Sequence, residues 1–182
     1  MLVLWATWLL SWLLAAAWSR RTRVRQTGAE QLRYGLLIWA GAFMLFGNSR
    51  VFGPLRGPIY PESRPLSWAA LIAVALGLGW TWWARLHLGS LWSGVVTLKV
   101  DHKVVRSGPY RFTRHPIYTG LLFALLATAL VRDSWAATVG WVLLLAGFVV
   151  KLGQEEQLLS SVLGAEYSKY RSDVAALVPG VW

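Results

Sequence analysis

Five long apolar stretches constrain the possible folds of this chain more than any other feature. They cover residues 2–18, 34–52, 66–84, 116–131 and 135–150. A helix rises about 1.5 Å per residue, so roughly 20 residues cross the hydrocarbon core of a bilayer. The first three stretches are long enough for this. The last two are shorter and are separated only by Arg132, Asp133 and Ser134, which predicts a short antiparallel hairpin.

The composition indicates that these stretches face lipid. Hydrophobic residues make up 56% of the chain and charged residues 14%, whereas a soluble domain carries about 25% charged residues. The 13 Trp residues agree with this, because indole rings favour the membrane–water interface. We therefore expect an all-α membrane protein with about five transmembrane helices. The chain has no Cys, which excludes disulfides and Cys-ligated metals, and we expect no metal site.

The basic residues indicate how the chain is oriented. The net charge is +10, but Lys and Arg lie between the apolar stretches, so nucleic acid is not an expected partner. Of the 18 basic residues, 14 lie in three alternate segments, 19–33, 85–115 and 151–182. The positive-inside rule then predicts an N-terminus outside and a C-terminus in the cytoplasm. Positive charge follows the first stretch instead of preceding it, which predicts a retained helix and not a signal peptide.

Two polar segments fall on the predicted cytoplasmic side. One covers residues 99–118 and leads into the hairpin, and the other covers residues 151–171 and leaves it. Because a hairpin brings its two ends together, we expect these segments to meet at the membrane surface. The expected location is the inner or plasma membrane of a prokaryote, with any active site facing the cytoplasm.

The first polar segment contains a candidate anion site. Pro116 suits the first turn of a helix, where its missing N–H costs nothing. The residues before it lie at the helix N-terminus, where free N–H groups and the helix dipole favour an anion. Arg114 can add a bidentate contact to a carboxylate or phosphate. The alternative is a snorkelling Arg114 and an interfacial His115 that merely end a membrane span.

The second polar segment places charged side chains at the end of the last apolar stretch. Lys151 and Glu155 are four residues apart and share a helix face, and Glu156 follows directly. Carboxylates at the end of a membrane span are costly unless they are solvated, paired or used. A structural Lys151–Glu155 ion pair in a solvated turn is the alternative. An apolar stripe then predicts an amphipathic helix on the cytoplasmic membrane surface, formed by Leu158, Leu159, Val162 and Leu163.

The two segments together resemble the isoprenylcysteine carboxyl methyltransferase family over roughly residues 90–182. The first part of the resemblance is His102-x-x-Val105, Ser107-Gly108-Pro109-Tyr110 and Arg114-His115-Pro116-x-Tyr118-x-Gly120. The second part is Glu155-Glu156, Leu163-Gly164-x-Glu166-Tyr167-x-x-Tyr170 and Val178-Pro179-Gly180. Both parts occur in order around the hairpin, which makes the combined signal specific.

The resemblance implies a small membrane methyltransferase that holds S-adenosylmethionine near the cytoplasmic face. The residues expected to contact this cofactor are His102, Lys103, Val104, Val105, Tyr110, His115, Pro116, Ile117, Tyr118, Glu155 and Glu156. The expected catalytic residues are Glu155, Lys151 and Arg114. The family usually carries Arg at the position of Lys151, where it engages the carboxylate of the acceptor. Lys keeps the charge but loses the planar fork of Arg.

The predicted function is methyl transfer from S-adenosylmethionine to a lipid-associated acceptor, such as an isoprenylcysteine carboxylate or another lipid. Residues 1–88 are expected to form a three-helix part that shapes the route of the acceptor from lipid, and residues 89–182 to bind the cofactor and carry the chemistry. Two alternatives stay open. One is an NADPH-dependent reductase of the membrane sterol type, which the RHP-x-Y segment also resembles. The other is a non-catalytic protein that binds anionic lipid.

Soluble methyltransferases have an α/β sheet with a Gly-rich first turn. Gly77 and Gly79 instead lie inside an apolar stretch, so we interpret them as helix packing residues. The identity of the acceptor and the oligomeric state are not predicted by the sequence.

Overall fold

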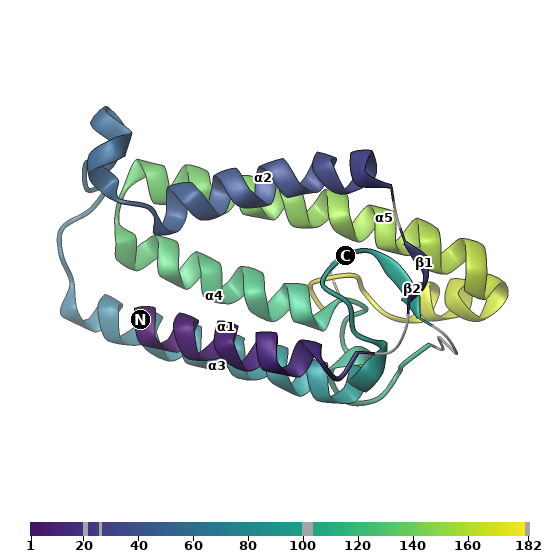
Figure 1. Cartoon of the computed structure of the whole chain (residues 1–182). Helices are drawn as coiled ribbons and strands as arrows, with labels where there is room; N and C mark the ends of the chain where they lie inside the picture. The colour runs from purple at the N-terminus through teal and green to yellow at the C-terminus, as the bar shows by residue number, and fades with distance from the viewer. Residues whose placement is uncertain (20–21, 26, 100–103, 181–182) are drawn as a thin grey trace.

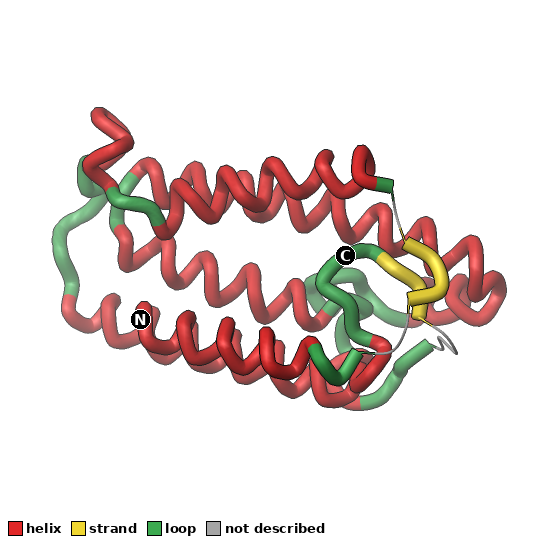
Figure 2. The backbone as a smooth tube through the Cα atoms, in the orientation of Figure 1, coloured by secondary structure: helices red, strands yellow, loops and turns green. Residues whose placement is uncertain are grey.

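The computed structural model describes residues 1–19, 22–25, 27–99 and 104–180, and it is mainly helical (Figure 2). The α-helices in these residues are α1 (Leu2–Ala16), α2 (Gly28–Phe46), α3 (Arg64–Leu88), α4 (Pro116–Arg132) and α5 (Trp135–Asp173). Short 3-10 helices cover Ser49–Arg56, Gly89–Leu91 and Gly108–Arg111. Strands β1 (Thr22–Arg25) and β2 (Thr97–Lys99) form an antiparallel ribbon that the all-α prediction did not include.

Glycine pairs allow the helices to approach each other backbone to backbone. A Cβ atom at Gly77 of α3 would lie 2.7 Å from the carbonyl oxygen of Gly120 in α4. A Cβ atom at Gly41 of α2 would lie 2.6 Å from the carbonyl oxygen of Gly140 in α5. Such contacts are typical of helix packing in membranes. The interpretation of Gly77 as a packing residue is confirmed, whereas a Cβ atom at Gly79 would meet nothing within 4 Å.

Helix α1 is held against α3 and α4 by tryptophan side chains. The indole N–H of Trp8 donates to Thr81 Oγ1 at 2.8 Å, and that of Trp5 donates to Thr128 Oγ1 at 3.0 Å. Trp82 of α3 donates back to Ser11 Oγ at 3.1 Å. Each bond satisfies a polar group inside an apolar bundle, where an unpaired one is costly.

Within the described residues, two helical segments are long and apolar enough to cross a membrane by length and composition, Arg64–Leu91 and Trp135–Asp173. Leu2–Ala16 and Pro116–Arg132 are apolar but shorter. Large apolar side chains also face outward from the bundle, among them Leu14 at 79% and Trp39 at 77% exposure. Extended apolar surface of this kind is typical of contact with a membrane or a partner. The fold is therefore consistent with a membrane protein, and five membrane-spanning helices stay a prediction.

The basic segments gather at one end of the bundle. The α1–α2 and α3–α4 connections and the end of α5 lie together there (Figure 1). The α2–α3 connection and the α4–α5 turn lie at the opposite end (Figure 1). This is the grouping that the charge pattern predicted, while the orientation of the bundle in a membrane stays a prediction.

Helix α5 differs from the prediction. The sequence indicated a short last span ending near residue 150 and a separate surface helix, but the helix continues past residue 150 as far as a kink at Gly164, and a second helical stretch then runs to Asp173. Residues 151–157 are mostly Lys, Leu, Gln and Glu, which favour a helix, so no break occurs. The backbone departs from helical geometry only at Gly164, where φ is 55°. Leu158 and Leu159 accordingly line a cavity beside α5.

The predicted α4–α5 hairpin is present. Asp133 adopts a left-handed conformation with φ of 40°, and Ser134 Oγ caps α5 by accepting from the N–H of Ala137 at 3.2 Å. Two residues therefore reverse the chain, and the two polar segments of the sequence return to the same end of the bundle.

Candidate active site

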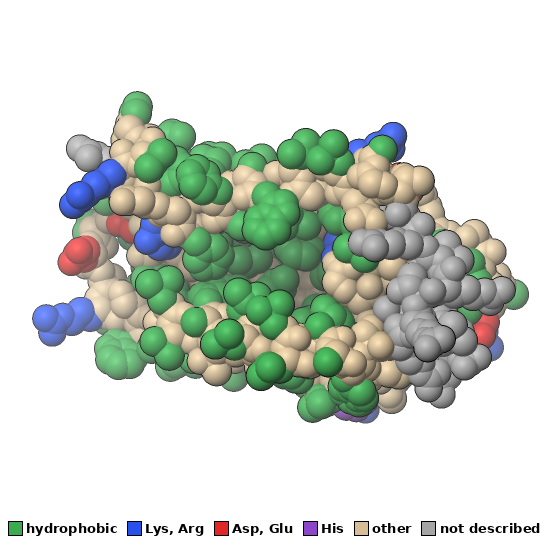
Figure 3. All heavy atoms as spheres, viewed as in Figure 1, with side chains coloured by type: hydrophobic (Ala, Val, Ile, Leu, Met, Phe, Trp, Pro, Cys, Tyr) green, Lys and Arg blue, Asp and Glu red, His purple; other side chains and the backbone are tan. Residues whose placement is uncertain are grey.

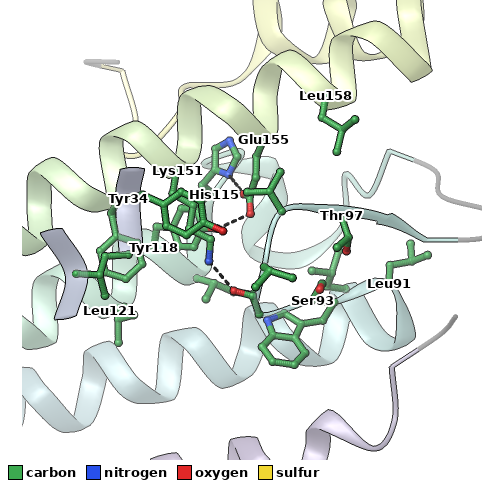
Figure 4. A pocket seen from close by; sticks show the side chains of 18 of the residues that line it. Tyr34, Leu91, Ser93, Thr97, His115, Tyr118, Leu121, Lys151, Glu155 and Leu158 are labelled. Carbon is green, nitrogen blue, oxygen red and sulfur yellow. Dashed lines mark hydrogen bonds and ion pairs between the residues drawn. The ribbon is translucent and has the colours of Figure 1, made fainter. Parts of the chain in front are cut away.

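A cavity of about 490 Å³ lies at the end of the bundle where the polar segments meet. Its volume falls within the range of about 300–1,000 Å³ that is common for small-molecule sites. One part is polar and is lined by Tyr110, His115, Tyr118, Lys151 and Glu155 (Figure 4). The rest is mainly apolar and is lined by side chains of α1, α2, α4 and α5 and by residues 91–97.

Glu155 is the carboxylate of this cavity. Tyr118 donates its hydroxyl hydrogen to Glu155 Oε1 at 2.5 Å, and His115 Nδ1 lies 3.5 Å from Glu155 Oε2 (Figure 4). The rings of His115 and Tyr118 are parallel, with centroids 5.5 Å apart. These contacts fix the direction in which the carboxylate faces the cavity.

His115 lies between two carboxylates. Its Nε2 is 3.2 Å from Glu156 Oε1, on the side opposite to Glu155. Burial by itself lowers the pKa of His115, but the hydrogen bonds to Glu155 and Glu156 outweigh burial and raise this pKa above its usual value. When protonated, the imidazole can donate to both carboxylates, and its contacts link the end of the first polar segment to the start of the second.

Lys151 extends from α5 one turn before Glu155. Its Nζ donates to the carbonyl oxygen of Gly94 at 2.8 Å, and it lies 5.6 Å from the ring centroid of Tyr34 and 5.3 Å from that of Tyr118. An ammonium group over aromatic faces is stabilised electrostatically. Because an ammonium group has three N–H donors, the bond to Gly94 leaves it able to bind a further acceptor.

Arg114 is occupied by protein partners. Its Nε donates to Glu156 Oε1 at 2.6 Å, and its Nη1 donates to the carbonyl oxygens of Arg171, at 3.0 Å, and Val174. The backbone N–H groups of Arg114 and His115 donate to the carbonyl oxygens of Ala175 and Ala176. The N–H groups before Pro116 are thus not free for an anion, contrary to the prediction, because a neighbouring segment of the chain supplies their acceptors.

Tyr110 contributes a neutral hydroxyl to the cavity. It lies in the 3-10 turn Gly108–Arg111, and the hydroxyl of Tyr170 donates to its backbone carbonyl at 2.6 Å. Burial, and secondly the nearby Tyr170 and Glu155, raise the pKa of the Tyr110 phenol well above its usual value. The phenol therefore stays protonated at neutral pH and can donate a hydrogen bond to a ligand.

The chain matches the sequence model of the isoprenylcysteine carboxyl methyltransferase family over residues 69–161. It belongs to this family. It is similar to protein-S-isoprenylcysteine O-methyltransferases from Schizosaccharomyces pombe, at 31% identity over 53% of this chain and 42% of that protein, and from Xenopus laevis, at 30% identity over 66% and 44%. A probable protein-S-isoprenylcysteine O-methyltransferase of Oryza sativa subsp. indica is 28% identical over 66% of each chain. The chain thus spans between 42% and 66% of the length of these relatives.

The part of the chain that matches the isoprenylcysteine carboxyl methyltransferase family contains most of the predicted site. The predicted residues that line the cavity are Tyr110, Arg114, His115, Ile117, Tyr118, Lys151 and Glu155. The predicted residues that do not line it are Val104, Val105, Pro116 and Glu156. Pro116 is buried at the start of α4, and Glu156 is buried against Arg114 and His115. His102 and Lys103 lie outside the described residues, so their predicted role is not tested.

Some lining residues precede the part that matches the isoprenylcysteine carboxyl methyltransferase family and were not predicted. They are Trp8 and Trp12 of α1 and Tyr34, Gly35, Ile38 and Trp39 of α2. One signal was present, because Trp5, Trp8 and Trp12 recur at spacings of three and four residues and thus share a helix face.

Proposed function

We propose that this protein is an integral membrane methyltransferase that moves a methyl group from S-adenosylmethionine to the carboxylate of a lipid-linked acceptor of the S-isoprenylcysteine type. The observation that carries the proposal is the cavity. It combines a carboxylate, an ammonium group and aromatic rings at one end with apolar walls at the other. The names of the relatives, protein-S-isoprenylcysteine O-methyltransferases, support the choice of acceptor.

The polar end of the cavity suits S-adenosylmethionine. A sulfonium is favoured by a nearby carboxylate and by aromatic faces, and Glu155 and Tyr118 supply both. We propose that Glu155, Tyr118, His115 and Tyr110 hold the cofactor. When bound, S-adenosylmethionine supplies a methyl group that its sulfonium has already activated for displacement.

The protein must then orient the acceptor and exclude water. The Lys151 ammonium group is placed to hold an acceptor carboxylate, since it faces the cavity and has donors to spare. A carboxylate acceptor carries no proton to remove, so no general base is needed. If the acceptor were an amine or a thiol, Glu155 or His115 would instead accept its proton. The apolar walls keep water away from the two reacting groups.

The apolar part of the acceptor is proposed to enter between α1 and α2. Cavity-lining side chains of both helices border a hollow on this face of the molecule (Figure 3). Trp39 lines the cavity while 77% of it is exposed, so the cavity is open toward this side. A lipid chain can therefore reach the site from the bilayer without passing through water.

Titration with S-adenosylhomocysteine tests the cofactor proposal. We expect the detergent-purified protein to bind S-adenosylhomocysteine in isothermal titration calorimetry and to show no binding of NADPH. We expect Tyr118→Ala to weaken this binding by about 10-fold or more, because the variant removes the ring that stacks on His115 and the donor to Glu155.

Asp173→Asn is the control for that titration, because Asp173 forms an exposed ion pair with Arg106 and an exposed bond with Ser172 and does not line the cavity. Such a pair contributes little to stability. Binding of NADPH without S-adenosylhomocysteine would favour a reductase. Binding of neither compound would favour a non-catalytic protein that binds anionic lipid.

A further inference from the structure

Glu156 does not line the cavity, yet it is buried with two guanidinium groups and the imidazole of His115 around it. Its Oε1 accepts from Arg114 Nε at 2.6 Å and from His115 Nε2 at 3.2 Å, and its Oε2 lies 3.3 Å from Arg171 Nε. A buried carboxylate is costly unless it is paired in this way. The Arg114 and Arg171 guanidinium groups thus hold it from two sides.

The same groups fasten the segment that follows α5, which returns to the start of α4. Arg114 donates to the carbonyl oxygens of Arg171, near the end of α5, and of Val174, the first residue of this segment. The backbone of the segment also pairs with residues 113–115. The carbonyl oxygens of Ala175 and Ala176 accept from the N–H groups of Arg114, at 2.8 Å, and His115, at 3.1 Å. Thr119 of α4 donates its hydroxyl to the carbonyl oxygen of Leu177 at 2.7 Å. Ala176 and Leu177 are buried, so the segment is part of the core.

We propose that Glu156, Arg114 and Arg171 form a clamp that holds residues 174–177 against the start of α4, and that this clamp positions His115 beneath Glu155. Glu156 is then a positioning residue and not a cofactor ligand. His115 is held from three sides, by Ala176 through its backbone, by Glu156 through Nε2 and by the Tyr118 ring. Its Nδ1 is thereby directed at Glu155.

Helix geometry explains why two adjacent glutamates have different tasks. Successive residues of an α-helix point about 100° apart, so Glu155 and Glu156 cannot face the same space. Glu155 faces the cavity, and Glu156 faces Arg114, His115 and Arg171. The effect of the clamp on the cofactor site rests on the proposed function, whereas the clamp itself does not.

Glu156→Gln is the variant that tests the clamp, with readouts that need no activity. The amide keeps the shape of the side chain but removes the charge. We expect hydrogen exchange in peptides covering residues 113–119 to become about 10-fold faster, because the guanidinium groups lose their charged partner. We also expect the pKa of His115 to fall, since Glu156 is one of the two carboxylates that raise it.

The titration of His115 is measurable by NMR, because the chain contains only three His residues. In the wild type, His115 keeps its proton to higher pH than in an unfolded chain, so its contribution to stability is present at low pH and is lost as pH rises through the raised pKa. The groups that face it are Glu155, Glu156 and the Tyr118 ring. In Glu156→Gln, the stability contributed by protonated His115 is expected to be lost at a lower pH than in wild type.

Two further variants make the outcome decisive. Arg171→Gln removes one guanidinium group whose side chain is 59% exposed, and we expect faster exchange in residues 113–119, in weaker form, if Glu156→Gln does not fold. Asp173→Asn is the control and should change neither readout.

A folded Glu156→Gln or Arg171→Gln protein with unchanged exchange in residues 113–119 overturns the clamp. Faster exchange with an unchanged His115 titration overturns the positioning role. If the clamp is supported while S-adenosylhomocysteine fails to bind the wild type, only the proposed function fails.

Discussion

Glu155→Gln is expected to weaken binding of S-adenosylmethionine by about 10- to 100-fold while changing binding of S-adenosylhomocysteine by less than about 3-fold. The reason is charge. S-adenosylmethionine carries a sulfonium and S-adenosylhomocysteine a neutral thioether, so a carboxylate at the cavity wall favours the former. Gln keeps the size of the side chain and its bond with Tyr118. The measurement is a pair of calorimetric titrations on wild type and variant.

The kinetics of Glu155→Gln separate two roles of the carboxylate. If Glu155 acts by attracting the cofactor, the KM for S-adenosylmethionine rises and kcat does not fall, because the sulfonium charge that the carboxylate favours decreases during transfer to a carboxylate. A fall in kcat with a changed pH profile would instead identify Glu155 as a proton acceptor, and hence a protonated acceptor group. Equal weakening of both ligands would contradict the electrostatic role.

Lys151→Met is expected to lower kcat/KM for a carboxylate acceptor by about 100- to 1,000-fold, since it removes a buried charged partner of the acceptor. Binding of S-adenosylhomocysteine should persist, because Met keeps most of the apolar stem. The check is a steady-state assay with varied concentrations of an S-isoprenylcysteine, with the cofactor at saturation.

Lys151→Arg is the matched variant for this prediction. It keeps the charge and adds the planar fork that the family usually carries, so it should retain activity within about 10-fold of wild type. An acceptor analogue whose carboxylate is replaced by an amide should be a poor competitive inhibitor of wild type. In Lys151→Met, the amide analogue and the carboxylate acceptor should bind about equally well. If Lys151→Met binds the carboxylate acceptor as tightly as wild type does, Lys151 has no part in acceptor recognition.

The sequence was sufficient to predict the local elements of the site. The apolar stretches predicted the helices, Pro116 predicted the start of α4, and Asp133 with Ser134 predicted the reversal that returns α5 to the same end. The two polar segments were predicted to meet, and the 2.5 Å contact between Tyr118 and Glu155, which are 37 positions apart, shows that they do. These predictions rest on local geometry and on one short connection.

The sequence was not sufficient where the result depends on which helix faces meet. Trp8 and Tyr34 line the cavity because α1 packs on α3 and α2 packs on α5, and both pairings are long-range. Arg114 was expected to bind a ligand; it lines the cavity, and its Nε and Nη1 donate to a carboxylate and two carbonyl groups that follow it by more than 40 positions. Glu156 and Glu155 point in different directions because successive residues of a helix are about 100° apart. The length of α5 was underestimated because the polar residues from Lys151 onward were interpreted as the end of the helix.

Transfer of a labelled methyl group tests the central claim most directly. The purified protein in lipid nanodiscs is incubated with S-adenosylmethionine labelled in its methyl group and with S-farnesylcysteine as the acceptor. We predict label in the lipid fraction that mild base releases as methanol, because the product is a carboxyl methyl ester, and we predict its loss in Lys151→Met. Absence of transferred label, or label that resists base, would contradict methylation of a lipid-linked carboxylate.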